Sequence, residues 1–255
     1  MDKITRKELK HDKFAEEVQH SIEYVGDHKS QVKLYAGIGV AVIVLIVGIY
    51  SYMSSQQAQR EAALKEALKV QGSAVGAQQS PDIMVFPTSE ARNKAIIDKF
   101  TEVANKYSGS DQGVMAKYYL GINYADMGKL DDAEKAFLEV ENKGSKNYAP
   151  LGRYALAQIY EARGKFAEAE KELRAIMDSP SILLSKEQAT ISLARVIAKT
   201  KPDEARKMLE PFRASTRPAV SRAALDAFAS LPAAGKPTQY ERIYRYDPPL
   251  RWRHV

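Results

Sequence analysis

The sequence predicts an all-α protein in which a single transmembrane helix is followed by a solenoid of helical hairpins. Three observations support this prediction. Residues 34–53 contain no charged side chain. Between residues 90 and 230, apolar residues recur at helical spacing and no β alternation competes with them. Two stretches of this second region repeat one another, which is typical of stacked helical hairpins.

Residues 34–53 have the length and composition of a membrane anchor. The stretch holds ten Leu, Ile or Val residues, and as a helix it would be about 30 Å long, the thickness of a bilayer's hydrocarbon core. These ten side chains favour insertion by roughly 3–6 kcal/mol. Tyr35, Tyr50 and Tyr52 lie at the two ends, where aromatic rings suit the headgroup region. The alternative is a buried core helix, but core helices seldom contain 18 or more consecutive apolar residues.

Residues 1–33 form a short tail before the anchor. Phe14, Val18, Ile22 and Val25 make an amphipathic helical stripe. Such a helix could lie on the membrane surface, dock on a partner, or remain solvated. The tail carries seven Lys or Arg residues, and basic residues in short segments stay in the cytoplasm. The apolar run begins too late for a cleavable signal peptide, so we expect an uncleaved signal anchor behind a cytoplasmic tail.

Residues 54–89 are predicted to be a helical stalk followed by a flexible linker. The stalk is rich in Ala, Gln, Glu, Lys and Leu, which favour helix, whereas Gly and Pro break the pattern after Gln71. One face of the stalk would hold Leu64, Ala67, Leu68 and Gln71. The domain beyond is expected to fold by itself from about Ser89, unless the stalk completes its core.

Residues 90–230 are expected to contain about eight helices. Gly128 and Gly164 fall in turns, Pro218 lies near a helix start, and Ser185 opens a capping box. After a first helical stripe from Ile96 to Tyr107, the expected helices are roughly 112–127, 131–141, 150–163, 167–178, 186–200, 203–214 and 218–230.

The stretch from Leu120 to Phe137 recurs 36 residues later, from Leu156 to Leu173. Identical residues stand at Leu120/Leu156, Tyr124/Tyr160, Gly128/Gly164, Lys129/Lys165, Ala133/Ala169, Glu134/Glu170 and Lys135/Lys171. A fixed period near this length predicts a helix–turn–helix repeat. In such a unit glycine permits the tight turn, and small residues let the helices approach closely.

These residues resemble the consensus of the tetratricopeptide repeat family. The positions that carry the resemblance are Leu120, Gly121, Tyr124, Gly128, Ala133 and Phe137, and then Leu156, Ala157, Tyr160, Gly164, Ala169 and Leu173. The family's tryptophan is replaced by Lys117 and Arg153, and a third unit around Leu193 lacks the turn glycine. The resemblance implies a degenerate tetratricopeptide-repeat α-solenoid over residues 90–230.

In that fold the first helix of each hairpin lines a concave groove. The resemblance places Tyr118, Ile122, Tyr154, Gln158, Ile191 and Arg195 in the partner-binding groove. The alternative is that the tyrosines only pack against a neighbouring helix. Chaperone-adaptor repeats that clamp a terminal carboxylate have Lys and Asn where this chain has Tyr118, Ile122 and Tyr154, so the groove is expected to favour apolar or extended segments.

As a whole, the chain resembles the ancillary Sec-translocon subunit (YfgM-like) family of single-pass bacterial inner-membrane proteins. That resemblance implies a periplasmic repeat domain and protein partners, namely translocon subunits, periplasmic chaperones or exported clients. Its function would be that of a scaffold in protein export or envelope quality control. The alternative is a scaffold of another envelope machine, for cell division or cell-wall synthesis.

The residue inventory argues against an enzyme. The chain has no cysteine, and its four histidines, at positions 11, 20, 28 and 254, all lie outside residues 90–230. Thiol nucleophiles, histidine bases and histidine metal sites are therefore excluded from that domain. We expect no catalytic residue, cofactor, metal or small-molecule substrate. The acidic run that includes Asp131, Asp132 and Glu134 fits a solvated helix face better than a metal site.

The net charge of +6 is spread along the chain, which does not suit a nucleic-acid partner. The basic C-terminal tail, residues 231–255, interleaves arginines with aromatic residues. We expect this tail to be disordered. The alternatives are contacts with anionic headgroups, a protein or nucleic acid.

Overall fold

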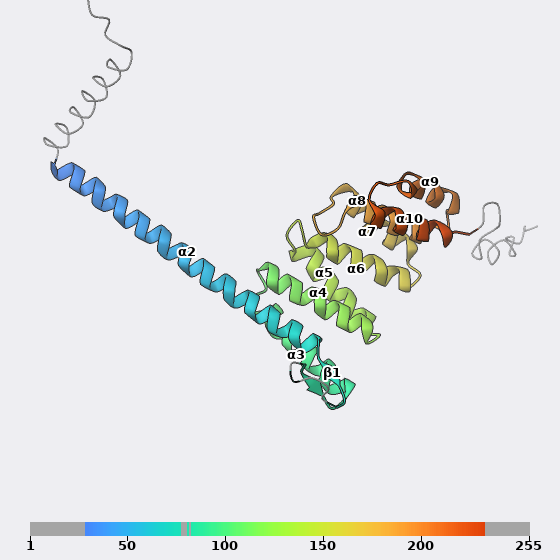
Figure 1. Cartoon of the computed structure of the whole chain (residues 1–255), viewed down its shortest axis with the longest axis horizontal. Coiled ribbons are helices and arrows are strands. Elements are labelled where there is room, and N and C mark those ends of the chain that lie inside the picture. The colour runs from blue at the N-terminus through green and yellow to red at the C-terminus, as the bar shows by residue number, and fades with distance from the viewer. Residues whose placement is uncertain (1–28, 78–80, 82, 233–255) are drawn as a thin grey trace, which may run out of the picture. The chain divides into compact units, whose positions relative to one another are not determined.

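The structure is a computed structural model that describes residues 29–77, 81 and 83–232. Nine helices and one pair of short strands make up this described part (Figure 1). The chain divides into two compact units, residues 1–59 and residues 60–255. The expected amphipathic helix of the N-terminal tail and the Arg/aromatic C-terminal tail lie outside the described residues.

The described residues of the first unit belong to one apolar helix. Helix α2 (Lys29–Gln71) is 43 residues long. Its most apolar 18-residue stretch has a mean hydropathy of 2.3, and none of that stretch is buried. Among the described residues it is the one helix that is long and apolar enough to cross a membrane. The helix continues without a break to Gln71, through the residues for which the sequence predicted a helical stalk.

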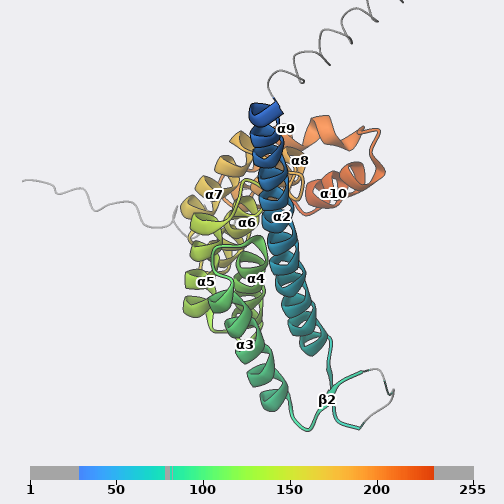
Figure 2. The same ribbon diagram turned by 90° about the vertical axis from the view of Figure 1, so that its left-hand side faces the viewer.

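The second unit contains the end of α2 and eight further helices, as the sequence predicted. They are α3 (Ser89–Lys106), α4 (Asp111–Asp126), α5 (Leu130–Lys143), α6 (Ala149–Ala162), α7 (Phe166–Asp178), α8 (Lys186–Ile197), α9 (Pro202–Arg213) and α10 (Pro218–Ala229). From α3 on, each helix packs against the next along the chain. Figure 2 shows them in chain order, from green α3 to orange α10.

Local side-chain chemistry sets several of the helix starts. The hydroxyls of Thr88, Ser110 and Ser185 each accept a hydrogen bond of 3.2 Å from a backbone N–H in the first turn of α3, α4 and α8. These bonds satisfy amides that have no partner within the helix. Pro202 and Pro218 begin α9 and α10, positions where the missing N–H costs nothing.

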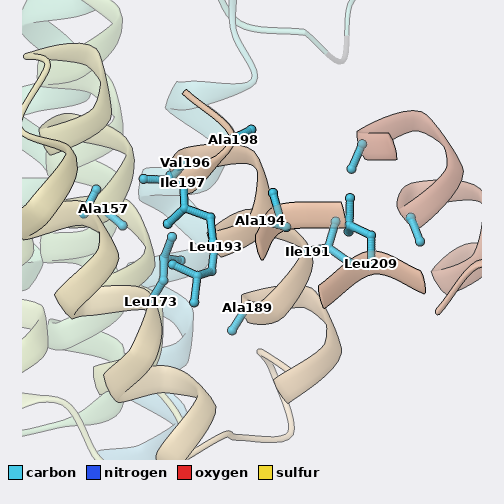
Figure 3. Packing of buried hydrophobic residues seen from close by; sticks show 14 of the residues in the cluster. Ala157, Leu173, Ala189, Ile191, Leu193, Ala194, Val196, Ile197, Ala198 and Leu209 are labelled. Carbon is cyan, nitrogen blue, oxygen red and sulfur yellow. The ribbon is translucent and has the colours of Figure 1, made fainter. Parts of the chain in front are cut away.

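The core consists of three clusters in succession along the stack. The first joins the end of α2 to α3 and α4, the second lies among α4, α5 and α6, and the third extends from α6 to α10. Figure 3 shows the third cluster, in which Leu193 and Ile197 of α8 face Leu173 of α7. Ala157 and Ala169 are almost completely buried, and their small size allows the close helix contacts that the repeat predicted.

The stalk belongs to the core of the repeat unit. Ala67 is fully buried and Val70 is 4% exposed, and both pack with Ile96 and Phe100 of α3. Ala63 and Leu64 are partly buried against the same cluster. The inner face is therefore made by Ala63, Leu64, Ala67 and Val70, whereas Leu68, expected there, is 37% exposed. The compact unit begins at Arg60, about thirty residues before the boundary expected from the sequence.

The described residues after α2, where the sequence predicted a flexible linker, include two short strands. Strands β1 (Ala74–Val75) and β2 (Val85–Phe86) pair in parallel, and Phe86 packs against the first core cluster. Arg92 of α3 donates hydrogen bonds to the carbonyl oxygens of Gln71, at 2.5 Å, and Ser73, at 2.9 Å. These strands could not be predicted from the sequence, because two residues are too few to show a β alternation.

The two turn glycines adopt the conformation that the repeat predicted. The φ angles of Gly128 and Gly164 are +74° and +72°, in the left-handed region. A Cβ atom at either position would meet nothing within 4 Å. Any cost of a side chain there is therefore conformational and does not come from a clash.

We predict that a chain beginning at Ser54 folds cooperatively, whereas a chain beginning at Ser89 is less stable by roughly 3–6 kcal/mol, because Leu64, Ala67 and Val70 no longer cover α3. Thermal melting followed by circular dichroism measures the difference. In the Ser54 chain, Ala67→Asp should reproduce most of the loss, and Ala62→Asp, at an exposed position of the same helix, should be nearly neutral. Equal melting of the two truncated chains would contradict this role of the stalk.

We also predict that Gly128→Ala and Gly164→Ala each lower the free energy of unfolding by about 1–2 kcal/mol, the cost of a left-handed residue with a Cβ. Gly109→Ala is the control, because that turn glycine has open space around it and no positive φ. Urea denaturation of the Ser54 chain gives the three values. A loss at Gly109 equal to the other two would show that the left-handed turn is not the cause.

Candidate functional site

The predicted groove positions fall into two groups. Tyr154, Gln158, Ile191 and Arg195 line two adjoining cavities formed by α6, α7, α8 and α10. Tyr118 and Ile122, on α4, line neither of these cavities. The candidate site is therefore the C-terminal half of the groove that the repeat register predicted.

The larger cavity lies among α6, α8 and α10 and has a volume of about 330 Å³. Its lining residues are Tyr154, Ser185, Gln188, Ile191, Ser192, Arg195, Ala219, Val220 and Ala223. Ile191 is the most buried of the large side chains in this lining and is only 5% exposed. Apolar side chains of α10 form one wall, and the hydroxyl, amide and guanidinium groups come from α6, α8 and the turn before α8.

The smaller cavity, of about 110 Å³, adjoins the larger one. It is lined by Tyr154, Ala157, Gln158, Glu161, Leu173, Ser192, Arg195 and Val196. Tyr154, Ser192 and Arg195 line both cavities. The hydroxyls of Tyr154 and Ser192 lie 3.2 Å apart and share a hydrogen bond, which ties α6 to α8 at the boundary between the cavities.

The contribution of α10 was not foreseen from the sequence. Ala219, Val220 and Ala223 lie in the last helix, outside the units that the repeat pattern identified. Ala223 stands four residues after Ala219 and three after Val220, spacings at which helical side chains are neighbours, and this was the available signal. Three further residues of the larger cavity were not predicted from the sequence, namely Ser185, Gln188 and Ser192. They are polar residues at the start and on the exposed side of α8.

Tyr118 takes part in the packing between helices. Its ring centroid lies 5.8 Å from that of Phe137 and 6.0 Å from that of Tyr119. Burial raises the pKa of Tyr118, with smaller contributions from Tyr119 and Tyr154. Ile122 is likewise packed against the second core cluster. The environment of these two residues is thus that of partly buried packing residues.

The two positions at which the family has tryptophan carry ion pairs in this chain. Nζ of Lys117 lies 3.2 Å from a carboxylate oxygen of Glu139. The guanidinium of Arg153 lies 2.8 Å from Glu141 and 3.1 Å from Glu172. Arg153 therefore links α5, α6 and α7. Glu172 is 8% exposed, and its pKa is raised by burial and, to a smaller extent, by the nearby Glu141.

A second ion-pair group joins α5 to α6. Arg163 contacts the carboxylates of Asp131, at 2.5 Å, and Glu134. The hydroxyl of Tyr160 donates a 3.2 Å hydrogen bond to Glu134. Burial, followed by the charge of Glu134, raises the pKa of Tyr160 to about 12. The acidic residues of α5 thus serve as partners for cations, and no group of His, Cys, Asp or Glu among the described residues is arranged to hold a metal ion.

The repeat-defining residues occupy the positions that the hairpin pattern requires. Leu120, Ala133, Phe137, Leu156, Ala157, Ala169 and Leu173 are all buried. Tyr124 and Tyr160 pack at the edges of the core clusters. Gly121 faces the ring of Phe137, and a Cβ on Gly121 would come within 2.4 Å of that ring. Glycine at this position therefore lets α4 and α5 approach closely.

The solved structures that resemble this chain do so distantly. No curated protein matches the sequence. Two crystal structures of nearly identical TPR-like repeats, from a kinesin light chain candidate of Podosopora anserina, resemble the chain with a TM-score of 0.47. They are 16% and 15% identical in sequence, and each alignment covers 69% of this chain and 84% of the other. At that level of similarity they add nothing to the fold described above.

A family model described as tetratricopeptide repeat-like domain matches residues 28–178, more than half of the sequence. The matched range contains the apolar helix α2 and the hairpins through α7. The chain therefore belongs to the tetratricopeptide repeat-like domain family.

Proposed function

We propose that this protein is a membrane-anchored scaffold that binds other proteins through the groove between α6, α8 and α10, and that it is not an enzyme. Tetratricopeptide repeat-like domains generally bind proteins, and stacked helical repeats present extended concave surfaces for this purpose. The observation that carries the proposal is the pair of adjoining cavities on first helices of successive hairpins. They combine apolar walls with a few polar groups, as binding sites do.

The anchor is proposed to be residues 34–53, in a bacterial inner membrane. Large apolar side chains such as Val44 and Leu45 are 64% exposed on α2, which is costly in water and favourable in lipid. We propose that residues 1–33 stay in the cytoplasm, because they carry seven basic residues before the apolar segment. The repeat unit would then lie in the periplasm, since long domains cross largely regardless of their charge.

The proposed setting is protein export or envelope quality control, with translocon subunits, periplasmic chaperones or exported clients as partners. What supports it is the order of parts along the chain, namely a short tail, an apolar helix and a degenerate repeat domain, which resembles the ancillary Sec-translocon subunit family. A scaffold of the division or wall-synthesis machinery would have the same order of parts. The identity of the bound proteins distinguishes the two settings.

The topology is tested with single cysteines, which are clean probes because the chain has none of its own. In intact spheroplasts, a membrane-impermeant maleimide should label Thr216→Cys, an exposed position between α9 and α10. Ser21→Cys should react only after the membrane is permeabilised. The opposite pattern would show the inverted orientation, and labelling of both without permeabilisation would show that residues 34–53 do not separate the two sites.

The groove is tested by photo-crosslinking in living cells. Benzoylphenylalanine at Gln158 or Gln188, which are exposed cavity residues, should give protein crosslinks. At Ala167, an exposed position of α7 outside both cavities, crosslinks should be several-fold weaker. Mass spectrometry of the products should identify translocon subunits or periplasmic chaperones, whereas division or wall-synthesis proteins would favour the alternative setting. Equal crosslinking from Ala167 would contradict binding in the groove.

A further inference from the structure

Arg195 is a cation with unused hydrogen-bond donors at the place where the two cavities meet. It lines both of them. Its Nη2 donates one long hydrogen bond, of 3.5 Å, to the carbonyl oxygen of Ala223. Within the part of the chain that the structure describes, it makes no ion pair, whereas Arg153 and Arg163 each contact two carboxylates. A guanidinium offers five N–H donors, so most of those on Arg195 remain available to a ligand.

No carboxylate inside the groove neutralises Arg195. The only acidic side chain in either lining is Glu161, in the smaller cavity, and its carboxylate lies 3.5 Å from Nζ of Lys199. The described lining of the larger cavity contains no acidic residue. Ser185 and Gln188 belong to the N-terminal end of α8, which adds a partial positive charge. Arg195 is thus the one charged side chain in the described lining of the larger cavity, and a cation there favours an anionic group.

The opposite wall of the larger cavity is apolar. Ile191, Ala219, Val220 and Ala223 contribute aliphatic surface. A volume of about 330 Å³ is at the lower end of the range for ligand pockets. It admits an aliphatic side chain with its adjoining backbone, but not a folded domain. The lining of the larger cavity thus favours a ligand that carries an aliphatic group beside an anionic group.

We propose that the groove binds an extended peptide segment in which an aliphatic residue enters the larger cavity and an Asp or Glu two residues away pairs with Arg195. In an extended chain, side chains two residues apart project from the same face about 7 Å apart, which suits two adjoining cavities. An arginine–carboxylate contact is charge-assisted and can be bidentate. This inference rests on the proposed function of the groove and adds the chemistry of the partner.

The test uses the full-length protein in lipid nanodiscs and a phage library of random dodecapeptides. Peptides selected by the native protein should be enriched in Asp or Glu two residues away from Leu, Ile or Val. Selected sequences are then synthesised with blocked ends, so that no terminal carboxylate contributes, and their binding is measured by fluorescence anisotropy. Arg195→Gln should weaken the acidic peptides about tenfold. It should leave their Glu→Gln analogues unchanged.

The control is Arg222→Gln, which removes the same charge from an exposed position of α10 that lines neither cavity. It should leave the affinity of the acidic peptides within about twofold of the native value. Selected peptides without acidic enrichment, or an acidic preference that survives Arg195→Gln, would overturn this inference while leaving the groove's role intact. Failure to select any peptide that competes for the groove would count against the proposed function itself.

Discussion

A helical hairpin cannot bury its apolar face alone, and this constraint shapes both ends of the repeat unit. Inner hairpins lie between two neighbours, but the end hairpins need a cover. At the start, the last turns of α2 cover α3, with Ala67 fully buried. At the other end, α10 buries Ala224 and Ala227 against the third core cluster. The last turns of α2 and helix α10 therefore both stabilise the stack, and α10 also forms a wall of the proposed binding site.

Charged contacts replace part of the usual apolar packing between the hairpins. Arg153 bridges Glu141 and Glu172, and Arg163 bridges Asp131 and Glu134. The side chain of Asp131 is exposed, but the other members of these groups are partly buried and lose hydration. Their net contribution to stability is therefore small, but a mispaired arrangement would leave a charge without a partner. We interpret them as determinants of the register between neighbouring hairpins. The guanidinium groups of Arg153 and Arg163 are thus paired with carboxylates inside the stack. The guanidinium of Arg195, in contrast, lines the two cavities.

The helices and turns could be predicted well because their signals are local. Helices α3 to α10 lie close to the segments expected from periodicity and punctuation, and the left-handed conformation of Gly128 and Gly164 follows from the repeat. The role of the stalk in the core could not be predicted in the same way. Its partners on α3 come after a long intervening loop, and its own apolar stripe is short. The repeat register also placed Tyr118 in the groove. It could not show that the neighbouring Phe137 and Tyr119 rings would enclose that side chain.

The order of contacts along the chain has a consequence for biogenesis. From α3 onward, helices contact others close to them in the chain, at most two helices away, so little loop-closure entropy opposes folding and each hairpin can form as soon as it emerges. Synthesis proceeds from the N-terminus, so the stack grows toward α10. The wall of the larger cavity at Ala219, Val220 and Ala223 is then added after α3 to α9. A nascent chain would fold from α3 to α9 before it has a complete groove, so a partner cannot engage the whole groove until α10 has emerged.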